Sequence, residues 1–79
     1  MAILDSISLE FANPEANSDK LYTAELSEED GTFVVRCSWG RRGAKQSSGE
    51  KYRGNDGSAA GAAYKKVVAE KTREGYTRA

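Results

Sequence analysis

The stretch SEEDGTFVVRCSW, residues Ser27–Trp39, decides the fold because it contains a tight turn followed by a strictly alternating strand. Asp30-Gly31 is a dipeptide that two-residue β-hairpin turns favour, since both residues tolerate a positive φ. After the turn, apolar side chains recur at every second position, which is the period of a strand with one buried face. These side chains are Phe33, Val35, Cys37 and Trp39. The stretch therefore predicts the turn and the second strand of a hairpin.

Three further strands are expected around this one. KLYTAEL, residues 20–26, precedes the turn and alternates in the same way. ISLEF, residues 7–11, also alternates, and the turn-forming residues of ANPEANSD separate these two strands. QSSGEKY, residues 46–52, predicts a weaker fourth strand because it contains little apolar surface before Tyr52.

The last third of the chain predicts one helix. Asp56 or Ser58 is expected to cap it, because a side-chain oxygen accepts hydrogen bonds from the free amides of the first turn. Apolar residues then recur at helical spacing. They are Ala60, Ala63, Tyr64, Val67 and Val68. Gly75 is expected to end the helix, since glycine adopts the left-handed conformation easily, and Tyr76 is expected to fold back as an apolar anchor.

The order of four strands and one helix predicts an α+β fold, a small antiparallel sheet of about four strands with one C-terminal helix packed on it. A chain of 79 residues suffices for one domain. We therefore expect a single domain over residues 1–79, with its core in about residues 7–78. The residues expected between sheet and helix are Phe33, Val35, Tyr64 and Val67. Cys37 shares their face and is expected to be a buried, unreactive thiol.

The composition lacks residues that many catalytic and metal sites use. The chain has no histidine and one cysteine, so zinc sites, catalytic triads and internal disulfides lack their residues. We expect no enzyme activity, no catalytic residue, no metal and no cofactor. The sequence has neither a signal-peptide pattern nor an apolar run of the roughly 20 residues that a membrane helix needs. An intracellular, cytoplasmic protein without a membrane partner is expected, and we take it as a monomer.

Charged residues are distributed unevenly along the chain, although the net charge is zero. Residues 1–35 contain eight acidic residues and one lysine, a net charge of −7. Residues 36–53 contain six basic residues and one glutamate, a net charge of +5, and residues 54–79 add +2. A basic segment beside an acidic start is typical of a molecule with one face suited to anions. Solvated strand and loop surface would give the same pattern.

The basic segment contains WGRRG, residues 39–43. Trp39 ends a strand on its inward face, so one edge of the ring is expected in the core and the other at the surface. Gly40 lets the backbone turn or approach a partner closely. Arg41 and Arg42 project on opposite sides if the chain stays extended. Aromatic rings stack on sugars and bases and guanidinium groups clamp phosphates, so the cluster suits a nucleic acid.

In this cluster and the residues after it, the chain resembles the WGR domain family, named for the tripeptide that is here Trp39, Gly40 and Arg41. KLY lies one hairpin upstream, as in the family. Downstream, the family shows an alanine-to-aromatic helix start, a Lys-Thr pair and a glycine-aromatic pair. Here these are Ala60 and Tyr64, Lys71-Thr72, and Gly75-Tyr76. The resemblance covers about residues 7–78 and implies an antiparallel sheet with a helix packed on it.

The resemblance also implies a function. In DNA-dependent poly(ADP-ribose) polymerases, WGR domains bind DNA near a strand break, where the motif tryptophan packs against a terminal sugar and basic residues contact phosphates. By position, Trp39 is the stacking residue and Arg41 the motif arginine, which in those polymerases also serves contacts between domains. From their charge, we add Arg42 and Lys45 to the candidate site. A single WGR domain without a polymerase domain or zinc fingers implies a bacterial protein, expected to associate with the nucleoid.

Two functions of different classes remain open. The first is a nucleic-acid-binding module, for DNA or RNA, with a preference for DNA ends or nicks. Its candidate residues are Trp39, Gly40, Arg41, Arg42 and Lys45. The second is a protein-interaction module that uses the same surface, since tryptophan and arginine are also frequent at protein interfaces. Salt separates the two, because phosphate contacts release counterions and weaken steeply as salt rises.

Overall fold

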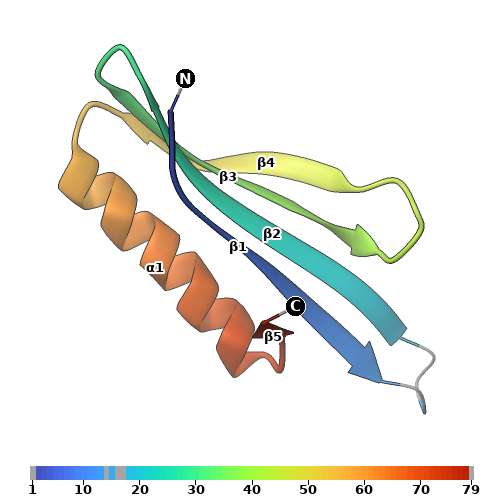
Figure 1. Ribbon diagram of the computed structural model, residues 1–79. Helices are drawn as coiled ribbons and strands as arrows, with labels where there is room; N and C mark the ends of the chain where they lie inside the picture. Colours follow the sequence, from blue (N-terminus) through green and yellow to red (C-terminus); the bar gives the residue numbers. More distant parts are fainter. Residues whose placement is uncertain (1, 14, 16–17, 79) are drawn as a thin grey trace.

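The structure, a computed structural model, describes residues 2–13, 15 and 18–78. These residues form, in chain order, β1 (Ala2–Asn13), β2 (Ser18–Glu29), β3 (Thr32–Arg41), β4 (Ser47–Gly54), α1 (Gly57–Arg73) and β5 (Thr77–Arg78). The strands make one antiparallel sheet in the order β4-β3-β2-β1-β5, and α1 packs along one face of it (Figure 1). The predicted α+β architecture is confirmed.

The turn between β2 and β3 sets the register of the central strand pair. Asp30 and Gly31 have φ values of 51° and 82°, and two successive positive values are what a two-residue hairpin loop requires. With this loop, Tyr22 of β2 lies opposite Trp39 of β3. The hairpin predicted from the sequence is therefore confirmed, and it brings two aromatic residues side by side.

The core lies between α1 and the sheet face that α1 covers, which we call the helix face. The buried apolar residues are Leu9, Tyr22, Ala24, Val35, Cys37, Ala60, Tyr64 and Val67. Burial of Val35, Tyr64, Val67 and Cys37 was predicted and is confirmed. Phe33 is a correction, because it is only partly buried and packs at the margin of the core. Its ring lies against the start of α1, where a Cβ on Gly57 would come within 3.1 Å of it.

Both ends of α1 follow the sequence signals. The Oδ1 atom of Asp56 accepts hydrogen bonds from the amide of Ser58, at 3.0 Å, and from the next amide, at 3.2 Å, so Asp56 is the N-cap. Gly75 has a φ of 111°, a left-handed conformation that turns the chain away from the helix axis. The amide of Tyr76 then donates to the carbonyl of Lys71 at 3.1 Å. This turn folds Tyr76 back onto the core, as predicted.

Two features of the sheet were not expected. After the turn at Gly75, Thr77 and Arg78 pair with the outer edge of β1, so the sheet has five strands in place of about four. Two residues are too few for an alternating pattern, which explains why the sequence did not indicate them. β1 also begins at Ala2, earlier than the predicted start at residue 7. The alternating pattern did not indicate this earlier start, because an irregularity between Ile3 and Asp5 interrupts it.

Candidate nucleic-acid interface

Trp39 lies near the end of β3 on the helix face and is partly buried. Its ring stacks on Tyr22, with ring centroids 6.2 Å apart and planes 19° apart. A Cβ on Gly49 of β4 would lie 3.3 Å from the Cη2 atom of Trp39. Glycine at this position therefore lets the indole lie across β4. The half-buried ring expected for a strand-end tryptophan is what the structure has.

Trp39 begins a continuous line of rings, which we call the aromatic row: Trp39, Tyr22, Tyr76 and Phe11. Tyr76 meets Tyr22 edge to face at 6.0 Å, and Phe11 meets Tyr76 at 5.7 Å. Tyr22 is at the centre and is 3% exposed. Burial raises the pKa of Tyr22, and a hydrogen bond with Cys37 adds to the effect. The phenol is therefore neutral at physiological pH and serves as a fixed support beneath Trp39.

Two lysines lie over the aromatic row. The Nζ atom of Lys51 is 5.7 Å from the ring centroid of Trp39. The Nζ atom of Lys71 is 4.9 Å from the centroid of Tyr22 and 5.9 Å from that of Tyr76. These are distances at which a cation is attracted by the ring face. The Lys71 side chain is 26% exposed and its amine is 3.5 Å from Glu74, so its stem covers the core while its charge stays near the surface.

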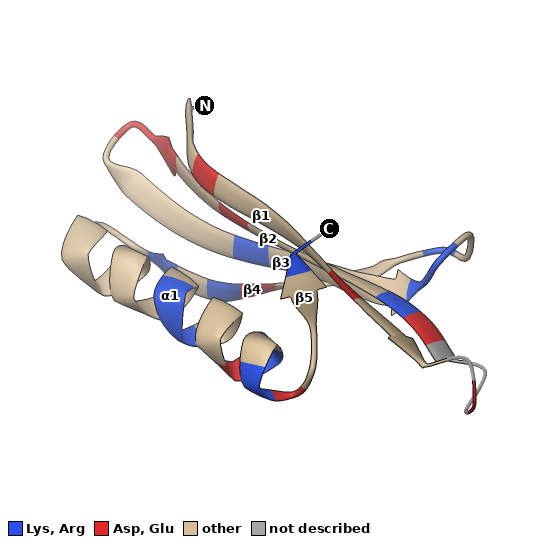
Figure 2. Cartoon of the chain, turned by 60° about the horizontal axis from the view of Figure 1, so that its bottom comes forward, with Lys and Arg blue, Asp and Glu red and all other residues tan. Residues whose placement is uncertain are grey.

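A hollow of about 330 Å³ opens between α1 and β4 beside these rings. We call it the lysine groove. Its lining residues are Tyr22, Lys51, Ala63, Lys66, Val67, Glu70 and Lys71. Three cations and one carboxylate give it a positive balance, and Tyr22 joins it to the aromatic row. Figure 2 shows basic residues along α1 and β4, together with acidic residues on β4 and near the C-terminal end of α1, and a separate acidic group at the hairpin between β2 and β3.

The structure separates the two neighbouring arginines of the motif. Arg41 is the last residue of β3 and, by strand alternation, lies on the face that carries Trp39, opposite Lys20 of β2. Arg42 begins the turn after β3. Its guanidinium donates to Asp19 at 3.0 and 3.1 Å and to Glu10 at 2.9 Å.

The ion pairs of Arg42 change what this residue can offer to a ligand. The hydrogen bonds with Glu10 and then Asp19 raise the pKa of Arg42, so it is permanently charged. Two carboxylates nevertheless surround that charge, which reduces its attraction for a phosphate. Arg42 ties the end of β3 to β1 and β2, and Arg41 is the motif arginine on the side of Trp39.

The loop between β3 and β4 is shaped by a glutamine. The Nε2 atom of Gln46 donates to the carbonyls of Arg41 and Ala44, at 3.1 and 3.2 Å. A Cβ on Gly40 would lie 3.1 Å from the same Nε2 atom. Glycine at position 40 therefore leaves room for the side chain that holds the loop together. Lys45 is exposed on this loop, away from the lysine groove.

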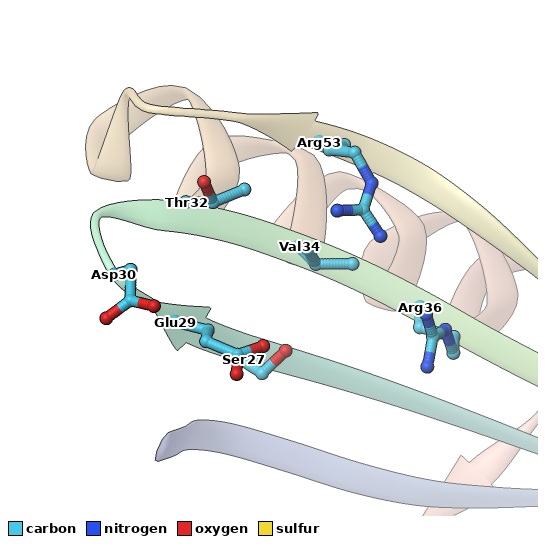
Figure 3. A pocket seen from close by; sticks show the side chains of 7 residues that line it. All are labelled: Ser27, Glu29, Asp30, Thr32, Val34, Arg36 and Arg53. Carbon is cyan, nitrogen blue, oxygen red and sulfur yellow. The ribbon is translucent and has the colours of Figure 1, made fainter. Parts of the chain in front are cut away.

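The opposite face of the sheet carries a different hollow, of about 260 Å³, near the β2–β3 turn. Figure 3 shows Arg36 and Arg53 on β3 and β4, with Glu29 and Asp30 at the turn. Arg53 pairs with Glu50 through two hydrogen bonds of 2.8 and 3.1 Å, and this contact lowers the pKa of Glu50. Positive and negative charges alternate here, so this face lacks the cationic excess of the lysine groove.

The candidate residues predicted from the sequence include Trp39 and Arg41 but not the lysines of the groove. Lys51 lies beside an irregularity in the pairing of β3 with β4, between Val35 and Arg36, which the alternating pattern does not indicate. Lys66 lies outside the apolar stripe of the helix, so the helical pattern does not place it beside the core. Lys71 could have been found, because a lysine within an apolar helical stripe must place its amine at the margin of the core.

Within the described residues, no cluster of potential metal ligands occurs, and no helix has the length and apolarity to span a bilayer.

Comparison with known proteins gives one match. The family model described as the WGR domain matches residues 5–79, nearly the whole chain. No match was found among curated proteins or among solved structures. The matched segment contains all of the sheet except the first residues of β1, the helix, and the Trp-Gly-Arg tripeptide at positions 39–41. The chain therefore belongs to the WGR domain family.

Proposed function

We propose that this protein binds DNA at strand ends or nicks, with Trp39 stacking on an exposed terminal sugar and with Arg41 and the lysine groove holding the adjoining phosphates. WGR domains are nucleic-acid-binding modules in poly(ADP-ribose) polymerase-like proteins. For this chain, the preference for strand ends and the roles given to individual residues are our proposal. Gly40, Arg42 and Lys45 belong to the same proposed contact surface, and we expect each to contribute less to the affinity than Trp39 and Arg41.

The partly buried ring of Trp39, which packs at the margin of the core, is the observation that carries this proposal. Tyr22 supports one side of the indole, and Lys51 lies over it at 5.7 Å. An aromatic platform among cations suits a ligand that has a flat or apolar face next to a phosphate. Inside a continuous duplex, the neighbouring nucleotides on both sides cover each base and crowd each sugar. At an end or a nick one face is open, so the platform favours such a site.

The acidic turn between β2 and β3 lies away from the proposed contact surface. The turn at Asp30 and Trp39 lie near opposite ends of β3, which corresponds to roughly 20 Å of extended strand. At physiological salt the Debye length is about 8 Å, so the acidic turn is largely screened from a phosphate held near Trp39. A chain of zero net charge can therefore bind DNA through a local cationic surface, with an affinity that depends strongly on salt.

Titration of the intrinsic Trp39 fluorescence tests the proposal, since the chain has one tryptophan. Three duplexes of equal length and sequence are compared: one blunt, one closed at both ends by hairpin loops, and one closed but nicked. We expect the blunt and nicked duplexes to bind at least about tenfold more tightly than the closed one, a difference of 1.4 kcal/mol that a single stacking contact supplies. A matched single strand reports whether an open base face suffices without a duplex.

Equal affinity for all three duplexes would remove the preference for ends and leave general DNA binding. Absence of any fluorescence change with DNA or RNA at low salt would contradict nucleic-acid binding through Trp39. The protein-interaction alternative predicts binding to a protein partner that changes little with salt, because an apolar docking surface releases few counterions.

The two motif arginines give a matched pair of variants. Arg41→Glu and Arg42→Glu change the net charge equally, but Glu10 and Asp19 already surround Arg42. We expect Arg41→Glu to weaken DNA binding more, and to reduce the slope of log affinity against log salt by about one for the lost phosphate contact. Arg42→Glu is expected to lower the melting temperature instead, because it places three carboxylates together. Equal losses of affinity would show that overall charge, not position, governs binding.

A further inference from the structure

We propose that the outer edge of β1 between Ala2 and Ser8, together with the groove that separates it from α1, is a docking site for an extended, acidic peptide strand of a partner protein. This site is separate from the aromatic row and the lysine groove. It does not depend on the proposed DNA binding.

The first argument concerns hydrogen bonding. On its outer side β1 pairs with β5 only at Leu9 and Glu10. Over residues 2–8, no described strand lies beside this edge (Figure 1). The amide of Ser6 donates to the Asp5 carboxylate at 2.9 Å, a local contact that an added strand would replace. Proteins usually blunt such edges with charges, prolines or short strands, and the only charged residue in this stretch is Asp5.

β5 provides the template for the added strand. Thr77 and Arg78 bind to the same edge of β1 in antiparallel orientation. A peptide collinear with β5 would continue this pairing toward Ala2. Main-chain hydrogen bonds would then supply affinity, and side chains at alternate positions would supply specificity, as in other strand-addition complexes.

The second argument is the groove beside this edge. A hollow of about 270 Å³ lies between β1 and α1, and its apolar lining comes from Ile7, Val68 and Ala69. Alternate side chains of a strand added to β1 would point to the helix face and enter this hollow. Beyond it, Ile3 and Leu4 are 60% and 54% exposed, and they are the large apolar residues most open to solvent in the described chain. An apolar side chain on the peptide is therefore required.

Charge favours an acidic partner. Lys65 and Arg78 line the groove together with a single acidic residue, Asp5. Tyr64 lies beside Asp5, and its pKa is raised by burial and by that carboxylate, so the phenol is neutral and adds no negative charge. Two cations against one carboxylate leave a positive balance, which a peptide bearing glutamate or aspartate between its apolar residues would neutralise.

A second copy of the chain fits this edge less well. Antiparallel pairing of residues 2–8 with the same residues of another copy would be centred on residue 5. The two Asp5 carboxylates would then lie directly opposite each other, and like charges in that position are destabilising. A heterologous peptide has no such conflict.

The helix itself supplies a matched control. Lys65 and Lys66 are adjacent, exposed residues of α1. Lys65 lines the groove beside β1, whereas Lys66 lines the lysine groove on the other side. Lys65→Glu and Lys66→Glu therefore change the same charge at two different surfaces. A third variant, Ala69→Gln, fills the groove with a polar side chain at an exposed position.

A phage-displayed library of random eight-residue peptides, selected on the intact chain, tests the proposal. We expect selected peptides to alternate apolar and acidic residues, and to shift the amide resonances of residues 3–8 and of Val68 and Ala69. Lys65→Glu should weaken their binding by about fivefold or more, since it replaces an attraction with a repulsion. Ala69→Gln should abolish binding, and Lys66→Glu should leave it unchanged. Peptides with N-methylated alternate amides should not bind, because they cannot complete the strand pairing.

Several results would overturn the proposal. One is a selection that enriches no peptides, or enriches peptides whose resonance shifts map away from β1. Another is binding that tolerates N-methylation at every amide. A third is a stable homodimer in sedimentation with residues 2–8 protected from amide exchange, which would make a second copy the occupant.

Loss of DNA binding in Lys66→Glu with peptide binding intact would show that the two surfaces act separately.

Discussion

Replacing Trp39 with alanine is expected to weaken binding to a blunt DNA duplex by about 1–3 kcal/mol, or roughly 5- to 150-fold, while the chain remains folded. The ring is only partly buried and stands at the margin of the core. Truncation therefore removes the stacking surface without leaving a closed cavity. Some loss of stability is expected from the lost contact with Tyr22, because aromatic pairs contribute about 0.5–1.5 kcal/mol beyond their buried area.

Fluorescence anisotropy of a labelled duplex measures this effect, since the variant lacks the intrinsic reporter. Circular dichroism confirms that the sheet and helix persist. Trp39→Phe is the matched control: it keeps a ring on Tyr22 and should retain part of the affinity. If Trp39→Ala binds the duplex as tightly as the parent, Trp39 is not the stacking residue. If it unfolds the chain, the ring belongs to the core and WGRRG is a structural corner.

The sheet and helix were predictable because their signals are local. Alternation from Phe33 to Trp39 identifies a half-buried strand, Asp30-Gly31 identifies its turn, and the spacing from Ala60 to Val68 identifies the helix. Each of these patterns spans fewer than a dozen residues, so tertiary context is not needed to interpret it. β5 escaped prediction because two residues have no period, and its pairing with β1 depends on where the helix ends.

The candidate site likewise has one part that local sequence patterns predict and one part that they do not. The half-buried state of Trp39 and the place of Arg41 on the same face follow from strand alternation. The partners of Arg42 do not, because Glu10 lies 32 residues away in sequence and Asp19 lies 23 residues away. Only the pairing of β1, β2 and β3 brings these carboxylates to the end of β3.

The lysine groove shows why charge counting along the sequence is insufficient. Residues 36–53 carry the largest positive charge, yet Arg53 is paired with Glu50 and Arg42 with two carboxylates. The groove takes Lys51 from this segment and Lys66 and Lys71 from the helix. A surface assembled from two segments is visible only once the helix is packed on the sheet.

Tyr22→Ala is expected to have the largest effect on stability, about 3–5 kcal/mol, which is the cost of removing a large aromatic side chain from a core. Tyr22 is 3% exposed, stacks on Trp39, meets Tyr76 edge to face and lies under the amine of Lys71. Stabilities of 5–15 kcal/mol are typical of natural domains, and a fold of this size lies near the lower end. We therefore expect a large unfolded fraction at 37 °C.

Urea denaturation followed by circular dichroism measures this loss of stability, and Tyr22→Phe is the matched control. Phenylalanine keeps the ring contacts and removes the hydroxyl that hydrogen-bonds with Cys37, so it should cost no more than about 1.5 kcal/mol. Because Tyr22 supports Trp39 from below, Tyr22→Ala should also lose DNA binding, whereas Tyr22→Phe should retain it. If Tyr22→Ala were as stable as the parent, the aromatic row would not be part of the core. If it were unstable but still bound DNA tightly once folded at low temperature, the platform would not depend on Tyr22, and Trp39 would have to be held in place by β4 alone.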